Sequence, residues 1–178
     1  MIVEFLQLLR DILWLRRGPE DMPYSPALLV AVCVADIALQ WSLVQFLAID
    51  DGSLPLSLIE IVILLGFVYL ILMTRGLQNR FVQTATALQC CSIVFTLLVI
   101  PALFVLSGNP KLATPLTPMQ SLFALATLPV AIWKFVVDAH IFRHGLSVSF
   151  GRGFAVAAAW LAMQWIVGVA LHGAAQAP

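Results

Sequence analysis

Charged residues are scarce in this sequence. Nine Lys and Arg and nine Asp and Glu occur among 178 residues, so 10% of the chain is charged while 62% is hydrophobic. Soluble domains carry about 25% charged and roughly 45–50% apolar residues. A soluble fold cannot bury so much apolar surface, whereas a protein in a bilayer is apolar on its outside as well. The composition therefore excludes a soluble globular domain, and the formal net charge of zero gives no overall field that would attract nucleic acid.

Cysteines and catalytic motifs are equally sparse. Cys33, Cys90 and Cys91 lie in apolar runs without CxxC spacing, which argues against a disulfide framework and a cysteine zinc site. The sequence contains no G-x-S-x-G, P-loop, HExxH or G-x-G-x-x-G pattern, and these mark several common enzyme classes. We therefore expect neither an enzyme nor a bound cofactor or metal.

The sequence does contain long apolar runs. Each has about 20–26 residues, enough to cross roughly 30 Å of hydrocarbon at 1.5 Å per residue. Backbone amides find no partner in lipid, so separate long runs are expected to be helices. We predict an all-α, polytopic transmembrane bundle of about five helices, surrounded by membrane lipids, in a domain at 26–178. Its spans are expected at about 26–49, 54–74, 81–106, 119–142 and 153–172.

The N-terminal segment has a helical period but is too polar to span. Its polar face carries Glu4, Gln7, Arg10, Asp11 and Arg17, and its apolar face carries Ile2, Phe5, Leu6, Leu9, Ile12 and Leu13. Such a helix lies flat in the membrane interface or packs against the cytoplasmic end of the bundle, and the sequence leaves both open. Three prolines in 18–26 end this helix. Residues 1–25 are therefore predicted to be an amphipathic interfacial helix and a proline-rich linker.

Local signals mark where some spans begin. Ser25 before Pro26 is typical of an N-cap followed by the first helical residue. Thr117 and Gln120 have the spacing of a capping box, which would start the fourth span.

Ser57 and Glu60 have the same capping-box spacing. If they cap a helix, the second span begins near residue 57 and Glu60 lies in its first turn, near the outer surface. The alternative is that Glu60 is a buried functional carboxylate in the outer half of the bundle.

Basic residues alternate between the two sides of the predicted spans. One side holds Arg10, Arg16 and Arg17 before the first span, Arg75 and Arg80 between the second and third, and Arg143 and Arg152 between the fourth and fifth. The loops on the other side hold Asp50, Asp51 and Lys111. Cytoplasmic loops are enriched in Lys and Arg. The bias predicts a multi-pass protein of the cell membrane with its N-terminus in the cytoplasm and its C-terminus on the opposite side.

Several polar side chains fall at similar depth inside the predicted spans. They are Asp36 and Gln40 in the first, Gln89 in the third, and Lys134 and Asp138 in the fourth. Intramembrane charges cost roughly 2.5–3.5 kcal/mol each on translocon scales, so we expect them to form one buried polar layer in the cytoplasmic half. We expect Asp36 to contact Lys134, with Asp138 as the competing partner.

This layer has two interpretations. In the structural one, its charges neutralise each other and its polar side chains fix the register of the helices. In the functional one, the layer is a proton or ion relay or a polar substrate site, because one cation beside two carboxylates leaves a negative charge over.

Two further patterns lie on helix faces. His140 and His144 have HxxxH spacing, but no third ligand lies at their depth and His172 is expected at the opposite surface, so we interpret them as interfacial histidines without a metal. Small-residue stripes run along the first and fifth spans, formed by Ala31, Ala35 and Ala38 and by Ala155, Ala159 and Ala162. Such stripes permit close helix contacts within the chain, with a second copy or with another membrane protein.

Two stretches carry a family resemblance. Arg80-Phe-Val-Gln-Thr-Ala-Thr-Ala-Leu88 leads into the third span, and Ala139-His-Ile-Phe-Arg-His-Gly-Leu-Ser-Val-Ser-Phe-Gly-Arg-Gly-Phe154 joins the fourth to the fifth. Both resemble the corresponding segments of bacterial members of the Yip1-domain superfamily of small five-span membrane proteins. The resemblance implies a small five-span helical architecture. It implies no catalytic residues. The Asp-Leu-Tyr-Gly-Pro and Gly-Tyr-Gly motifs of the eukaryotic trafficking members are missing, which argues against a Rab-binding or vesicle role.

The leading functional hypothesis is a non-enzymatic scaffold, assembly factor or accessory subunit of a membrane complex. Its alternative is a small transporter or proton- or ion-conducting protein that uses Asp36, Glu60, Lys134 and Asp138. A membrane-embedded enzyme ranks third, because HxxxH is its only candidate motif.

Overall fold

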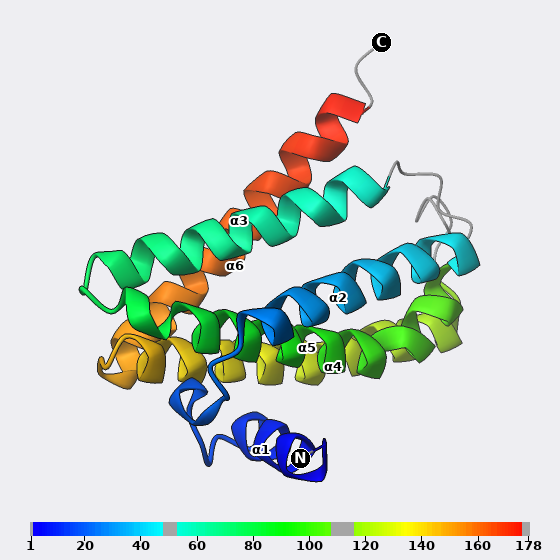
Figure 1. Cartoon of the computed structure of the whole chain (residues 1–178). Helices are drawn as coiled ribbons and strands as arrows, with labels where there is room; N and C mark the ends of the chain where they lie inside the picture. Colours follow the sequence, from blue (N-terminus) through cyan, green and yellow to red (C-terminus); the bar gives the residue numbers. More distant parts are fainter. Residues whose placement is uncertain (1, 48–52, 108–115, 176–178) are drawn as a thin grey trace.

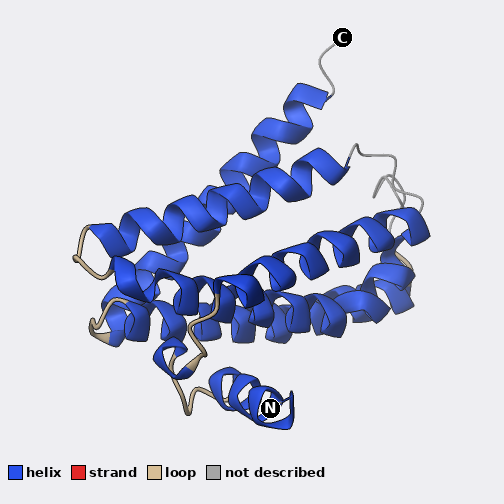
Figure 2. Ribbon diagram, viewed as in Figure 1, coloured by secondary structure: helices blue, strands red, loops and turns tan. Residues whose placement is uncertain are grey.

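The computed structural model describes residues 2–47, 53–107 and 116–175, and within these ranges it has helices, turns and loops but no strand (Figure 2). The α-helices are α1 (Ile2–Leu13), α2 (Pro26–Leu47), α3 (Ser53–Met73), α4 (Phe81–Ser107), α5 (Pro118–Gly145) and α6 (Phe150–Ala175). Two 3-10 turns, η1 (Pro19–Asp21) and η2 (Gln78–Arg80), precede α2 and α4. The all-α class is confirmed, and each predicted span coincides with one helix.

Among the described residues, four helical stretches are long and apolar enough to cross a membrane. They are α2, Gln78–Leu106, α5 and Phe150–Ala170. The apolar part of α3, Ser57–Met73, is shorter. Large apolar side chains point outward from these helices, including Phe46, Val62, Leu125, Ile132 and Trp165. Leaving one such side chain in water forgoes about 1.5–3 kcal/mol, so the chain is a multi-span helical membrane protein.

Helix α4 is central to the bundle. It packs most extensively against α5, and also against α2, α3, α1 and η1, while α5 packs against α6. In the view of Figure 1, α1 lies below α4 and α5, whereas α3 and α6 lie above them. Phe67 of α3 contacts two neighbouring helices, because its ring centroid is 5.3 Å from that of Trp160 on α6 and 5.9 Å from that of Phe142 on α5.

The densest packing is at one end of α4 and α5. Buried side chains there include Ala85, Ala87, Leu88 and Cys91 of α4 and Val137, Ala139, Ile141 and Phe142 of α5. Small residues let these helices approach closely. At Gly145 an added Cβ would lie 2.9 Å from Thr84 Oγ1, and at Gly153 it would lie 2.6 Å from the carbonyl oxygen of Ala139. This packing fixes α5 between α4 and α6.

Two of the three predicted helix starts are confirmed. The hydroxyl of Ser25 accepts a hydrogen bond of 3.2 Å from the amide of Leu28, and α2 begins at Pro26. At α5 the capping box is complete: the Thr117 hydroxyl accepts from the Gln120 amide, and the Gln120 side chain accepts from the Thr117 amide.

The predicted helix start at Ser57 is wrong. Helix α3 begins at Ser53, so Ser57 lies inside it, and its buried hydroxyl donates to Gln40 Oε1 at 3.1 Å. The Ser57 hydroxyl therefore bonds to a side chain of α2 and does not cap the backbone of α3. Glu60 lies in the second turn of α3 with an exposed side chain.

Helix α1 packs against α4 and α5, which is one of the two arrangements that the sequence left open. Ile12 is fully buried there, and Trp133 Nε1 donates to the carbonyl of Leu13 at 3.1 Å. On the polar face, Arg10 donates to Asp11 at 2.8 Å, and this hydrogen bond lowers the pKa of the Asp11 carboxyl. Other apolar side chains of this segment, Val3, Leu6 and Trp14, remain exposed, as suits a helix at a membrane interface.

Three helices end in the same way. A residue two or three positions beyond each end has a positive φ: Leu15 (59°) after α1, Gly76 (66°) after α3 and Ser147 (52°) after α5. In each case the next amide bonds back five residues, from Arg16 to Asp11, Leu77 to Leu72 and Val148 to Arg143. These are Schellman caps. The last two turn the chain sharply and bring Arg75, Arg80 and Arg152 to one end of the bundle.

Part of the orientation prediction lies outside the described residues. Asp50, Asp51 and Lys111, from the opposite loops, are not described, nor is the side chain of His172.

Candidate functional site

The side chain of Asp36 is held by two amides from two helices. Its Oδ2 accepts 3.1 Å from Gln40 Nε2 on the same helix and 2.6 Å from Gln89 Nε2 on α4. Asp36 and Gln89 are only 3% and 2% exposed. Because the Ser57 hydroxyl donates to Gln40, one network joins α2, α3 and α4. Hydrogen bonds to a charged group contribute about 1.5–3 kcal/mol each.

Lys134 pairs within its own helix. Its Nζ donates to Asp138 Oδ2 at 2.7 Å, and the exposed fractions of the two side chains are 30% and 7%. The expected Asp36–Lys134 contact is therefore wrong, and the competing partner Asp138 is the correct one. The i,i+4 spacing places Lys134 and Asp138 on one helical face. Lys134 therefore reaches Asp138 within α5 and does not need Asp36 of α2 as a partner.

The predicted polar layer thus consists of two hydrogen-bonded groups. One contains Asp36, Gln40 and Gln89, and the other contains Lys134 and Asp138. Sequence reasoning correctly placed these residues inside the bundle but misassigned one partner. Glu60 is in neither group, since it lies on the exposed side of α3.

Two small cavities adjoin Lys134. One of about 30 Å³ is lined by Leu64, Leu88, Ser92, Lys134, Asp138, Trp160 and Gln164, and another of about 200 Å³ is lined by residues including Ser92, Thr96, Thr127 and Lys134. A cavity above roughly 10–15 Å³ can hold a water molecule where polar partners are available. The Oδ1 atoms of Asp36 and Asp138 are buried and have no hydrogen-bond partner among the described residues. Each carboxylate therefore keeps one oxygen able to accept a proton or a hydrogen bond.

The hydrogen bond from Gln89 to Asp36 gives a stability prediction. Gln89→Leu leaves the buried carboxylate without its shortest hydrogen bond, so we expect the free energy of unfolding to fall by about 2 kcal/mol. Denaturant unfolding in detergent measures it. Gln45→Leu, the same change at an exposed position of α2, is the matched control and should leave stability unchanged. An equal loss in both variants would contradict a special role for Gln89.

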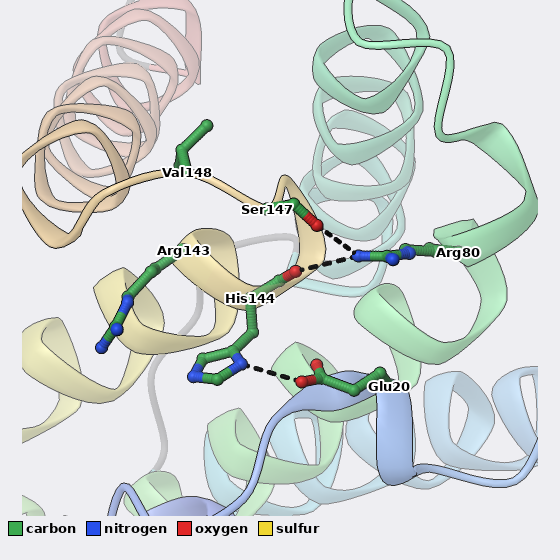
Figure 3. Close-up of a pocket in the computed structure, with 6 residues that line it drawn as sticks. All are labelled: Glu20, Arg80, Arg143, His144, Ser147 and Val148. Carbon is green, nitrogen blue, oxygen red and sulfur yellow. Dashed lines mark hydrogen bonds and ion pairs between the residues drawn. The ribbon is translucent and has the colours of Figure 1, made fainter.

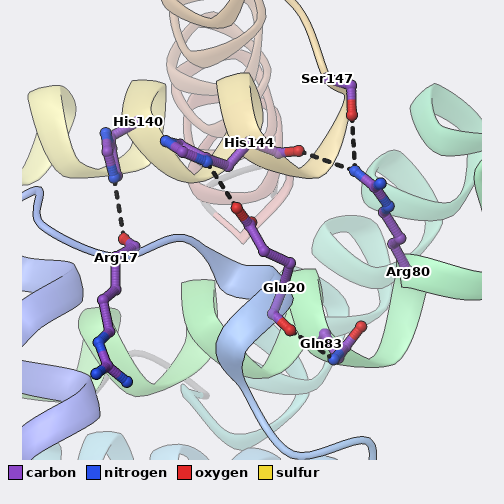
Figure 4. A network of polar contacts seen from close by, with 7 residues as sticks. All are labelled: Arg17, Glu20, Arg80, Gln83, His140, His144 and Ser147. Atoms are coloured by element: carbon purple, nitrogen blue, oxygen red, sulfur yellow. Dashed lines mark hydrogen bonds and ion pairs between the residues drawn. The ribbon is translucent and has the colours of Figure 1, made fainter.

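A second polar network lies at the end of the bundle that carries the arginines (Figures 3 and 4). Arg80 donates through one nitrogen to the carbonyl of His144 at 3.2 Å and to the hydroxyl of Ser147 at 2.7 Å. This ties the beginning of α4 to the cap of α5. Figure 3 shows that Arg143 and Val148 point away from this contact. No sequence pattern predicts this contact, because one of its acceptors is a backbone carbonyl.

The same network fastens the N-terminal linker to the bundle. His140 Nε2 donates to the carbonyl of Arg17 at 3.0 Å, and His144 Nδ1 donates to Glu20 Oε1 at 2.8 Å. Gln83 Nε2 donates to the carbonyls of Glu20 and Met22 at 3.0 and 2.7 Å. Figure 4 shows the contacts of His140, His144 and Gln83 with Arg17 and Glu20 along the linker.

The two histidine rings contact each other at an interplanar angle of 51°, with ring centroids 4.5 Å apart. Their nitrogens are directed to the linker, and the described residues contain no group of three or more metal-ligating side chains. The HxxxH pattern therefore has a structural explanation in this fold: it holds residues 17–20 against α5.

Comparison of the chain with protein-family models, with curated protein sequences and with solved structures found no match.

Proposed function

We propose that this chain is a non-catalytic scaffold, assembly factor or accessory subunit that binds another membrane protein or a second copy of itself. The observation that carries the proposal is the outward orientation of both alanine stripes. The stripe of α2 (Ala31, Ala35 and Ala38) and that of α6 (Ala155, Ala159 and Ala162) are exposed. Small residues allow backbones to approach closely in lipid, where van der Waals contact drives helix association. None of the described helices covers these faces, so a partner helix can pack on them.

The polar layer supports this proposal because its charges have partners within the chain. Lys134 pairs with Asp138 at 2.7 Å, and Asp36 is held by two glutamines. The Asp36 network fixes the register of α2, α3 and α4, and Lys134 neutralises the charge of Asp138 within α5. The layer then serves as an internal structural lock rather than as a path for solutes.

The membrane arrangement belongs to the same proposal. We propose that α3, with 21 residues, is a fifth span, since about 20 residues suffice to cross the hydrocarbon. The N-terminus then lies in the cytoplasm and the C-terminus opposite, in agreement with the positive-inside rule. This arrangement, together with 80–88 and 139–154, is the basis for proposing a Yip1-domain-like protein.

Bulky substitutions on the alanine faces test the scaffold function. We expect Ala159→Trp on α6 or Ala35→Trp on α2 to weaken association roughly tenfold, because a lost close helix contact costs about 1–2 kcal/mol. Association is measured by energy transfer between labelled copies in liposomes and by co-purification after mild detergent extraction.

Matched controls lie on the same helices. Leu161→Trp and Val30→Trp replace side chains that are 55% and 62% exposed but lie on a different face of each helix from the alanine stripes, so they should leave association unchanged. A chain that is monomeric and without partners in bilayers under all conditions would refute the scaffold function.

A second candidate function is a small proton- or ion-conducting protein. It is favoured by the two cavities beside Lys134, one of which also reaches Asp138, Ser92 and Gln164, together with the buried carboxylate oxygens. A relay needs such groups along a wet path. This function requires Asp36→Asn or Lys134→Met to abolish flux in proteoliposomes while the variants stay folded. Loss of folding in both would favour the structural lock.

A further inference from the structure

A hollow of about 520 Å³ opens between the end of α3 and the start of α6. Its wall includes Ile71, Thr74, Arg75, Val148, Arg152 and Val156. The Schellman cap after α3 and the turn after α5 place the two arginines on the same hollow, although they are far apart in the sequence. The hollow shares no lining residue with the polar layer, and it adjoins the pocket around Glu20 at Val148.

The charge of this hollow has one sign. Arg75 and Arg152 both line it, no acidic residue is among its described lining residues, and no ion pair is described for either arginine. Arg152 also lies in the first turn of α6, which contains no acidic residue. A cation is unfavourable at a helix N-terminus, where the helix dipole attracts negative charge. An anion between the two arginines would relieve both repulsions.

The rest of the wall is apolar and lies deeper along the same helices. Ile71 precedes Arg75 by four residues and Val156 follows Arg152 by four, which places each about 6 Å further along its span. Both are partly buried. Figure 3 shows the Val148 side chain pointing away from His144 and Glu20, out of the network on that side. The hollow therefore combines a cationic rim with an apolar floor that continues into the membrane.

We propose that this hollow binds one anionic glycerophospholipid of the arginine-bearing leaflet, with its phosphate between Arg75 and Arg152 and the start of an acyl chain against Ile71 and Val156. Arginine matches phosphate oxygens with a fork of donors. Basic pockets between spans bind lipid headgroups by the same chemistry. A soluble phosphate satisfies the rim but leaves the apolar floor without contact, so the floor argues for a lipid.

Lipid binding to the purified chain in detergent tests this proposal. Native mass spectrometry titrations compare phosphatidylglycerol with phosphatidylcholine. We expect one phosphatidylglycerol to bind more tightly than phosphatidylcholine. Arg75→Gln with Arg152→Gln should weaken its binding roughly 30-fold, at roughly fivefold for each basic residue beside a membrane phosphate.

Two comparisons separate a built site from general attraction. Arg16→Gln removes an exposed arginine that does not line the hollow, and it should leave the affinity within about twofold. Val156→Trp keeps both arginines but fills the floor, so it should also remove tight binding. This variant keeps the test valid if the double arginine variant fails to fold.

Three results would overturn the proposal. The first is equal affinity for the two lipids, and the second is the same loss in Arg16→Gln as in the double arginine variant. The third is displacement of phosphatidylglycerol by excess inorganic phosphate together with an unchanged affinity in Val156→Trp, which would identify a site for a soluble anion.

Discussion

Replacing Lys134 with methionine is expected to lower the free energy of unfolding by about 3–5 kcal/mol, the usual cost of removing one partner from a buried ion pair. The Asp138 side chain is only 7% exposed and its Oδ2 lies 2.7 Å from Lys134 Nζ. Its other oxygen has no described hydrogen-bond partner. Without the lysine, the carboxylate must stay charged in an apolar site or take up a proton. Equilibrium unfolding in mixed micelles measures the loss.

A double variant shows whether the pair itself or the unpaired charge matters. Lys134→Met with Asp138→Leu removes both charges, and we expect its stability to return to within about 1 kcal/mol of the wild type or above it, because apolar replacements of buried pairs are often neutral or stabilising. Arg10→Gln is the surface control. Its partner Asp11 lies at a similar distance of 2.8 Å, but the Arg10 side chain is 60% exposed, so the loss should stay below about 1 kcal/mol.

The same variants distinguish the two candidate functions. A Lys134→Met variant that is as stable as the wild type and folded but inactive in flux would contradict the structural lock and favour a relay. A destabilised single variant rescued by the double variant supports the lock, because only the unpaired charge is then harmful.

The long helices were predictable because their signals are local. An apolar run must be about 20 residues long to cross the hydrocarbon, and the structure places a helix on each of the five predicted runs. Thr117 and Ser25 indicated two helix starts, because each hydroxyl accepts a hydrogen bond from the amide three residues later. Ser57 has the same local pattern but donates to Gln40, and that tertiary hydrogen bond cannot be inferred from spacing alone.

The partners inside the polar layer were only half predictable. Depth along each helix follows from the sequence at 1.5 Å per residue, and this correctly gathered Asp36 with Gln89 inside the bundle. Rotation of each helix about its axis does not follow from depth. This rotation determines which side chains face each other: Asp36 bonds to Gln89 on α4, whereas Lys134 bonds to Asp138 on its own helix.

The packing of the N-terminal linker against the bundle could not be predicted from the sequence. His140 and Gln83 bond to backbone carbonyls of residues 17–22, and every residue has such a carbonyl. The caps at Leu15 and Ser147 were equally hidden, since positive φ angles are usually marked by glycine. The hollow between α3 and α6 depends on the turns at Gly76 and Ser147, so the pattern of basic residues in the sequence predicted only two cytoplasmic charges.

Gly153→Ala is expected to lower the free energy of unfolding by about 3 kcal/mol, at the upper end of the usual cost of overpacking. A Cβ at this position would lie 2.6 Å from the carbonyl oxygen of Ala139, 2.9 Å from the amide nitrogen of Arg143 and 2.8 Å from its Cβ. Backbone atoms cannot rotate away as a side chain can, so α6 must move off α5. Thermal unfolding in detergent measures the effect.

Two other glycines of α6 are matched controls. An added Cβ at Gly151 or Gly168 meets nothing within 4 Å, so Gly→Ala there should be neutral or stabilising by up to about 1 kcal/mol through helix propensity. Equal destabilisation at all three positions would contradict close packing at Gly153.

Gly153 also follows Arg152 directly, so a shift of α6 moves one arginine of the hollow away from Arg75. Phosphatidylglycerol binding should therefore weaken in Gly153→Ala and remain unchanged in Gly168→Ala, although both variants keep every charge of the hollow.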